Sequence, residues 1–125
     1  MRILLDTHVY LWWLQDSPKL SKTGKEKIIS ALDVYVSSAS IWEAAIKAGI
    51  GKLDVDVDVL VSEIGNNGFQ ELPITPKHAA RVKQLPNIHR DPFDRILLAQ
   101  ALSEPLQFLT VDGILAGYSE LVEVI

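Results

Sequence analysis

The chain has 125 residues, 48% of them hydrophobic, which is enough apolar surface for one core but too little chain for two ordinary domains. Cysteine is absent, which excludes disulfides, thiolate metal sites and a thiol nucleophile, and predicts a reducing, cytoplasmic compartment. A formal net charge of −4 argues against nucleic-acid binding through overall charge, although a carboxylate site neutralised by divalent cations would escape that argument.

Short β-branched or leucine-rich runs alternate with helical patterns along the whole chain, which predicts βα units around a mostly parallel sheet. Strands are predicted at Arg2–Leu5, Val34–Ser37, Phe69–Leu72 and Leu106–Thr110, with a fifth candidate at Val122–Ile125. Helices are predicted from Thr7 onward and at Ser21–Ala31, Ser40–Ala48, Pro76–Gln84 and Pro92–Ser103. The fold class is therefore α/β, as a single domain over residues 1–125.

Some segments allow more than one interpretation. Residues 54–61 alternate Asp and Val, so they could form an edge strand or the capped start of a helix. Trp12 and Trp13 are adjacent on a predicted helix and cannot both face the core, so one of them could contact a partner. The first apolar run carries a charge and is followed by Asp-Thr-His, so neither a signal peptide nor a membrane span is expected.

Acidic residues stand where the strands of this predicted sheet end. Asp6 follows the first strand, and Asp112 follows the fourth. Glu43 lies one turn into the helix after the second strand, and Asp94 lies in the first turn of the helix before the fourth. In open α/β sheets ligands bind beyond the carboxyl ends of the strands, so these four acids should meet at one edge.

Ordinary structural roles compete with this interpretation. Ser40-x-x-Glu43 matches a capping box, Asp91 is suited to cap the helix before Asp94, and Asp112-Gly113 is a turn signal. Only Asp6 lacks such an explanation, because an acid between two apolar segments is buried at a cost unless it has a partner. The case for a site rests on the joint placement of the acids.

Carboxylates are the ligands that Mg²⁺ or Mn²⁺ prefers. Phosphodiester hydrolysis needs an activated water and positive charge that stabilises the phosphoryl oxygens, and such ions supply both. His89, Arg90 and Arg95 lie beside Asp94 in sequence and could grip phosphate, although Arg95 could instead pair with Asp91. The three histidines, His8, His78 and His89, lack zinc-like spacing.

The sequence resembles a known family over nearly its whole length. The segments LLDTHVYLWWL, SSASIWEAAIKAGIGKL and LPITPKHAARVKQLPNIHRDPFDRILLAQAL, with the closing LTVDGILAGY, are similar to PIN-domain toxins of the VapC kind, most specifically at HRDPFDRILLAQA. The resemblance implies a three-layer fold and a metal-dependent endoribonuclease, paired with a small antitoxin that occupies the acidic groove, and a homodimer. It implies a site of Asp6, Glu43, Asp94 and Asp112, with accessory roles for Asp91, Thr7, Ser38 and Thr110.

Two other function classes remain open from the residues. An acidic-site phosphatase or receiver-like domain also uses acids at the carboxyl end of a parallel sheet, but its Asp-x-Asp arrangement would need an acid where His8 stands. A non-catalytic protein-binding module would use the acids only as caps and turns. Metal-induced stabilisation separates that module from an enzyme, because ions that bind the native state raise its stability.

Overall fold

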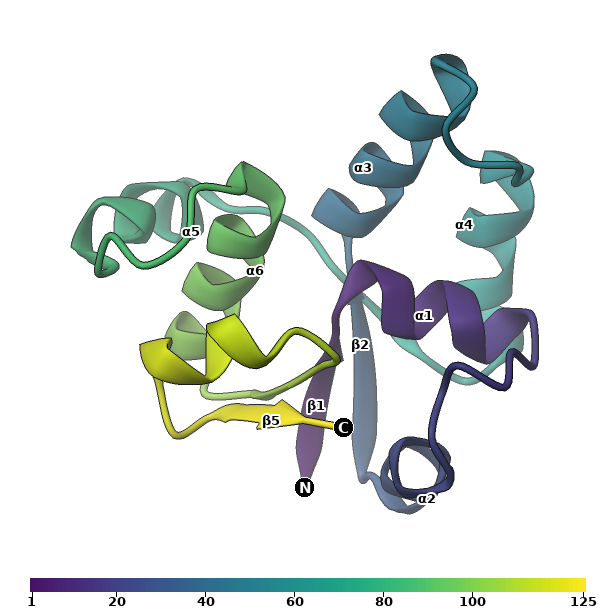
Figure 1. Ribbon diagram of the computed structural model, residues 1–125, viewed down its shortest axis with the longest axis horizontal. Coiled ribbons are helices and arrows are strands. Elements are labelled where there is room, and N and C mark those ends of the chain that lie inside the picture. The colour runs from purple at the N-terminus through teal and green to yellow at the C-terminus, as the bar shows by residue number, and fades with distance from the viewer.

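The computed structural model describes residues 1–125 as a parallel five-stranded sheet with the strand order β3-β2-β1-β4-β5, flanked by helices (Figure 1). The strands are β1 (Arg2–Leu5), β2 (Asp33–Ser37), β3 (Gln70–Leu72), β4 (Gln107–Thr110) and β5 (Val122–Val124). The helices are α1 (Thr7–Leu14), α2 (Lys22–Ser30), α3 (Ser38–Gly49), α4 (Val57–Asn66), α5 (Pro76–Arg81) and α6 (Pro92–Ser103), with 3₁₀ turns η1 (Val82–Gln84) and η2 (Gly113–Tyr118).

Alternation along the strands divides the core into two layers. In β1, Ile3 and Leu5 pack with α1, α2 and α4, whereas Leu4 packs with α6 on the other face of the sheet. Both faces of a strand that is covered on each side must be apolar, which is why β1 is a continuous hydrophobic run. The predicted α/β fold with helices on both sides of the sheet is confirmed.

The structure decides one segment that the sequence left open and moves the start of one predicted helix. The ambiguous Asp-Val segment is the capped start of a helix, because the Asp56 side chain accepts hydrogen bonds from the backbone N–H groups of Asp58 and Val59. The helix after β2 begins at Ser38 instead of Ser40, because Ser37 caps it by accepting from the N–H of Ala39 at 3.0 Å. The predicted capping box of Ser40 and Glu43 is therefore wrong, and Glu43 lies in the second turn.

The strand order places a topological switch point between β1 and β4. From β1 the chain builds the sheet outward through β2 and β3, and it then returns to add β4 on the other side. Connections leave in opposite directions at such a point, so the carboxyl ends of the two strands border a crevice where ligands bind. No helix has both the length and the apolar composition that a membrane crossing requires.

Candidate active site

Asp6 lies at the carboxyl end of β1 and caps the N-terminus of α1. Its carboxylate accepts hydrogen bonds from the N–H of Thr7 at 2.7 Å and from the hydroxyl of Thr110 at 2.6 Å, and the residue is only 5% exposed. Burial raises the pKa of Asp6, although these two hydrogen bonds oppose the shift. The hydrogen-bond partners expected for a buried acid are present, but burial still raises the pKa of Asp6 above its usual value.

Thr110 connects Asp6 to Asp112 across the switch point. Its hydroxyl donates to Asp6 and accepts a hydrogen bond from the N–H of Asp112 at 3.1 Å. The carboxylate of Asp112 accepts from the N–H of Ile114 at 3.0 Å and so begins η2. One buried hydroxyl thus fixes the relative positions of two acids that are more than a hundred residues apart in sequence.

Asp94 lies in the first turn of α6, beside the cap of that helix. Asp91 is the cap, accepting from the N–H groups of Phe93 and Asp94 at 2.8 and 3.2 Å. The imidazole of His89 contacts the Asp94 carboxylate at 2.9 Å. Burial, with the negative charges of Asp6 and Asp91, raises the pKa of Asp94 to about 7, although His89 opposes the shift.

Glu43 approaches the same region from α3 and is 4% exposed. Its carboxylate forms an ion pair with Lys47, one turn along the helix, with Nζ and Oε2 2.6 Å apart. The hydrogen bond to Glu43 raises the pKa of Lys47, to which the charges of Asp91 and Asp94 also contribute. The positive charge of Lys47 on α3 therefore interacts with Asp91 and Asp94 as well as with Glu43.

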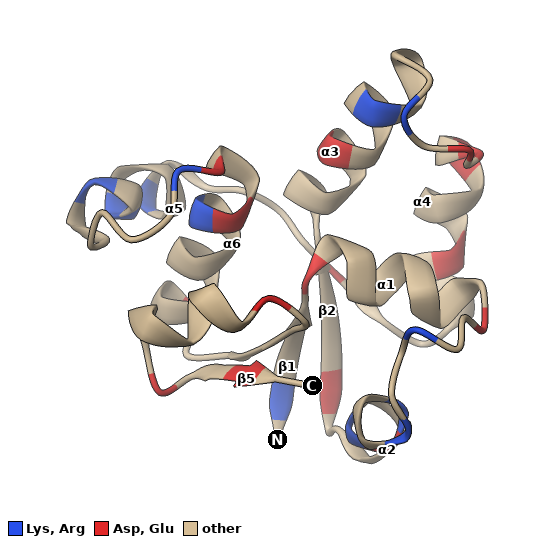
Figure 2. Ribbon diagram, in the orientation of Figure 1, with Lys and Arg blue, Asp and Glu red and all other residues tan.

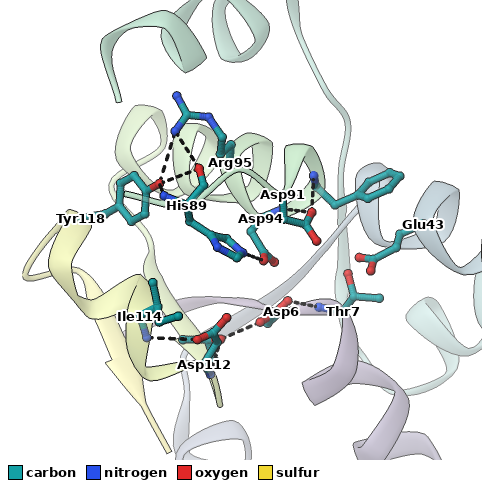
Figure 3. Close-up of polar contacts among 12 residues, drawn as sticks. Asp6, Thr7, Glu43, His89, Asp91, Asp94, Arg95, Asp112, Ile114 and Tyr118 are labelled. Carbon is teal, nitrogen blue, oxygen red and sulfur yellow. Dashed lines mark hydrogen bonds and ion pairs between the residues drawn. The ribbon is translucent and has the colours of Figure 1, made fainter. Parts of the chain in front are cut away.

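The acids of four separate segments surround one space at the carboxyl edge of the sheet (Figure 3). The negative charges of Glu43 and Asp6 raise the pKa of Asp6 and Asp94 respectively, which places these carboxylates within electrostatic reach of one another. Ligand atoms of His89, Asp94 and Asp112 all lie within 4.8 Å of each other. The acids therefore converge at the carboxyl edge of the sheet, as the sequence predicts.

The donor set fits a divalent cation. Carboxylate oxygens are the ligands of hard cations, and Asp6, Asp94 and Asp112 have no lysine or arginine ion-pair partner. Burial, with repulsion from neighbouring carboxylates, raises the pKa of Asp6 and Asp94, and a bound cation would stabilise their charged forms.

Some predicted accessory residues lie elsewhere. Ser38 is exposed and lines a groove between α3 and α4 instead of contacting the acids. The hydroxyl of Thr7 donates to Ser40 at 2.9 Å, so Thr7 supports Asp6 through its backbone N–H alone. Thr7 thus lies beside Asp6, and its hydroxyl contacts Ser40 instead of an acid.

Arg95 forms no ion pair with Asp91, which excludes one of its two interpretations. Its guanidinium donates to the carbonyl oxygens of Val82, Pro86 and His89 at 3.0–3.2 Å. Arg90 is exposed and forms no ion pair. Contact of either arginine with phosphate stays a prediction.

Sequence reasoning missed three side chains of this region. Lys47 pairs with Glu43. Ser40 supports Thr7, and Tyr118 binds the backbone of His89 through its hydroxyl. The i to i+4 spacing of Glu43 and Lys47 could have indicated that pair, whereas the contacts of Ser40 and Tyr118 depend on tertiary packing.

Comparisons with known proteins agree with this architecture. Residues 3–121 match the PIN domain family. Ribonuclease VapC22 of Mycobacterium tuberculosis is 29% identical over 113 residues, 88% of this chain and 86% of that protein. The structure of VapBC2 from Rickettsia felis bound to a promoter DNA fragment is similar with a TM-score of 0.72 and 15% identity, over 99% of this chain and 98% of that one. FitAcB from Neisseria gonorrhoeae has a TM-score of 0.67 and 24% identity, over 98% and 96% of the respective chains. The resemblance found in the sequence is thereby confirmed, and the chain belongs to the PIN domain family.

Proposed function

We propose that this chain is a metal-dependent endoribonuclease that uses Mg²⁺ or Mn²⁺. One observation carries the proposal: Asp6, Glu43, Asp94 and Asp112 come from four separate segments and face one space at the carboxyl edge of the sheet. Membership of the PIN domain family supports it, as does the similarity to a relative named as a ribonuclease.

Each acid has a distinct role in this proposal. A divalent cation, when bound, supplies positive charge to the phosphoryl oxygens and makes water a stronger nucleophile near neutral pH. Asp6 and Asp94 would hold that cation directly, and Glu43 and Asp112 would complete its shell or position the attacking water. Thr110 keeps Asp6 and Asp112 in register, while Asp91 acts through the helix that presents Asp94.

Replacement of Asp6 tests the site. Asp6→Asn keeps the shape of the side chain and the cap on Thr7 but removes the charge, so RNA cleavage in Mg²⁺ or Mn²⁺ should fall by at least about a hundredfold while the fold is retained. Asp58→Asn, at an exposed position in the first turn of α4, is the matched control and should cleave normally. Unchanged cleavage by Asp6→Asn, with circular dichroism showing a native fold, would contradict the site assignment.

The proposal extends to the biological role of a toxin, because the similar structures include toxin–antitoxin assemblies. A small antitoxin would cover the acidic groove, and the exposed Trp42 of α3 lies next in sequence to Glu43 at the rim of an apolar groove. Expression of the chain alone in bacteria should arrest growth, and expression of Asp6→Asn should not. Normal growth with the soluble wild-type protein would oppose a toxin role.

A homodimer belongs to the same proposal and rests on family membership. Multi-angle light scattering of the purified chain measures its mass directly, and twice 13.9 kDa is expected. A mass of one chain at all concentrations would remove the dimer from the proposal and leave the site untouched.

A binding module is the second candidate function, because Asp6, Asp91 and Asp112 all cap helices and thus have structural work without a metal. The two candidates differ in the response of the melting temperature to metal. Stabilisation at millimolar Mn²⁺ is expected for the enzyme, and the absence of any shift would favour the module.

A further inference from the structure

We propose that His89 is a direct ligand, together with Asp94 and Asp112, of one cation in this site, and that this nitrogen donor makes the site select Mn²⁺ over Mg²⁺. The inference rests on the proposed function and goes beyond it, since that function requires only carboxylates. Sequence spacing gave no reason to treat His89 as a ligand, because it lies on the loop before α6.

The distances already approach those of a coordinated ion. Two donors on the same ion, each about 2.1 Å from it, lie at most about 4.2 Å apart. The ligand atoms of His89, Asp94 and Asp112 lie within 4.8 Å of one another, so shifts of well under about 1 Å in side-chain position would suffice. The side chains of His89 and Asp94 are 26% and 16% exposed, which leaves room for entry from solvent (Figure 3).

The backbone of His89 is fixed from two sides. The Tyr118 hydroxyl accepts from the N–H of His89 at 2.7 Å and donates to its carbonyl oxygen at 3.2 Å. Arg95 donates to the same carbonyl at 3.2 Å. Tyr118 ends η2, the 3₁₀ turn that Asp112 begins, so one short element sets the positions of both Asp112 and His89. A loop held in this way presents its imidazole in a defined place.

The other histidines are unsuited to the role. His8 is exposed, and its ring lies 6.0 Å from that of Trp12. His78 is buried between the backbone of Thr75 and the carboxylate of Glu104. His89 alone combines partial exposure with contact to an acid of the site.

The donor chemistry determines which ion is favoured. Mg²⁺ binds oxygen almost without exception, whereas imidazole nitrogen is an ordinary ligand of first-row transition metals. Adding the imidazole of His89 to the carboxylates of the site therefore increases its affinity for Mn²⁺ and increases its affinity for Mg²⁺ little.

Pulsed electron paramagnetic resonance of the Mn²⁺-loaded wild-type protein tests the ligand directly. A coordinated imidazole gives a ¹⁴N modulation of the Mn²⁺ signal. We expect this modulation in the wild type and in His8→Gln, and its loss in His89→Gln. Glutamine can still donate a hydrogen bond to Asp94, so this variant separates ligation from mere orientation of Asp94.

Calorimetric titration supplies the second readout. In His89→Gln the affinity for Mn²⁺ should fall at least about tenfold, with a smaller change for Mg²⁺. His8→Gln, which removes an imidazole whose charge acts on Asp6, should change the two affinities alike. Mn²⁺ that binds the wild type without ¹⁴N modulation, or modulation that survives in His89→Gln, would overturn the inference and leave the nuclease proposal standing. Failure of the wild type to bind either ion would overturn both.

Discussion

Asp6 and Asp94 face the same space, but different surroundings control their charges. Asp6 is held by two short hydrogen bonds from Thr7 and Thr110 and is almost fully buried. Asp94 is more open and receives only one side-chain contact, from His89, while two other carboxylates repel it. Protonation of Asp94 therefore removes a partly buried charge that Asp6 and Asp91 repel.

This titration predicts a pH dependence of stability in the metal-free protein. Folded Asp94 keeps its proton up to about pH 7, whereas the unfolded chain loses it near pH 3.8. Between these values the folded state binds more protons, so the free energy of unfolding falls as pH rises. Thermal melts in a chelator should show this fall between about pH 4 and about pH 7, and Asp94→Asn should show a shallower one. Parallel curves for the two proteins would contradict the raised pKa.

A bound cation should stabilise the protein more at high pH than at low pH, which opposes the fall in stability of the metal-free protein. Protons and the cation compete for Asp94, so the rise in melting temperature caused by Mn²⁺ should be larger at about pH 8 than at about pH 6. Melting scans at both values, with and without Mn²⁺, measure the difference. Equal shifts at the two pH values would indicate that the ion binds without Asp94.

The sequence predicts the identity of the central acids well and their supporting contacts poorly. Asp6 could be singled out because an acid between apolar runs needs a reason, and the structure supplies its partners. The ring of His89 reaches Asp94 only because Tyr118 and Arg95 hold the intervening loop. Contacts of that kind depend on tertiary packing, which residue spacing does not describe.

A series of buried hydrogen bonds between side chains joins β2 to α6 and α5. The Ser37 hydroxyl donates to the side-chain oxygen of Gln100, whose amide donates to the carbonyl of Pro73 at 3.3 Å and contacts His78. His78 in turn contacts Glu104 at 2.7 Å. Because Gln100 is fully buried, its hydrogen bonds fix the position of α6 relative to the sheet and hence of Asp94.

Gln100→Leu should destabilise the protein by about 2–4 kcal/mol, because it leaves the buried Ser37 hydroxyl and the buried Leu72 carbonyl without their Gln100 partner. Urea denaturation measures the change. Ser103→Ala on the same helix is the control: the Ser103 hydroxyl is buried without a hydrogen bond, so its removal should be neutral or stabilising. A loss of stability for Gln100→Leu no larger than for the control would show that these hydrogen bonds contribute nothing.

Most elements could be predicted because their hydrophobic period and capping residues agree. The helix Pro92–Ser103 has the predicted bounds, since Asp91 and Pro92 mark its start. The start of α3 was displaced because Ser37, Ser38 and Ser40 all offer possible caps, and only packing selects Ser37. The Asp-Val segment stayed undecided because its alternation suits a strand while Asp56 suits a cap, and the tertiary contacts of Leu60 and Ile64 settle it.

At the scale of the whole molecule, the net charge of −4 conceals a separation of charge. Figure 2 shows acidic residues at the carboxyl end of β1 and on the facing parts of α3 and α6, and a group of basic residues on and after α5, with further basic residues on α2 and α3. The basic group comprises Lys77, Arg81, Lys83 and Arg90. An RNA strand that enters the acidic edge can therefore place neighbouring phosphates over this basic side.

Removal of one charge from that side tests the path. Measured in the Asp6→Asn background, Arg90→Ala should weaken RNA binding and reduce the slope of log affinity against log salt by about 0.7. Lys22→Ala, on α2 toward the opposite edge of the sheet, should change neither value (Figure 1). An unchanged slope for Arg90→Ala would exclude it from the phosphate path.

In the proposed mechanism, a divalent cation at the cluster of Asp6, Glu43, Asp94 and Asp112 activates water, and this water hydrolyses RNA. The most direct measurement is the cleavage of a mixed RNA pool by the purified chain, with the ends of the products mapped and chemically identified. We predict no cleavage in a chelator, cleavage restored by Mn²⁺ or Mg²⁺, and linear phosphate and hydroxyl ends, because water is the nucleophile. Cleavage that persists in the chelator, or ends bearing a 2′,3′-cyclic phosphate from attack by the RNA itself, would contradict the account.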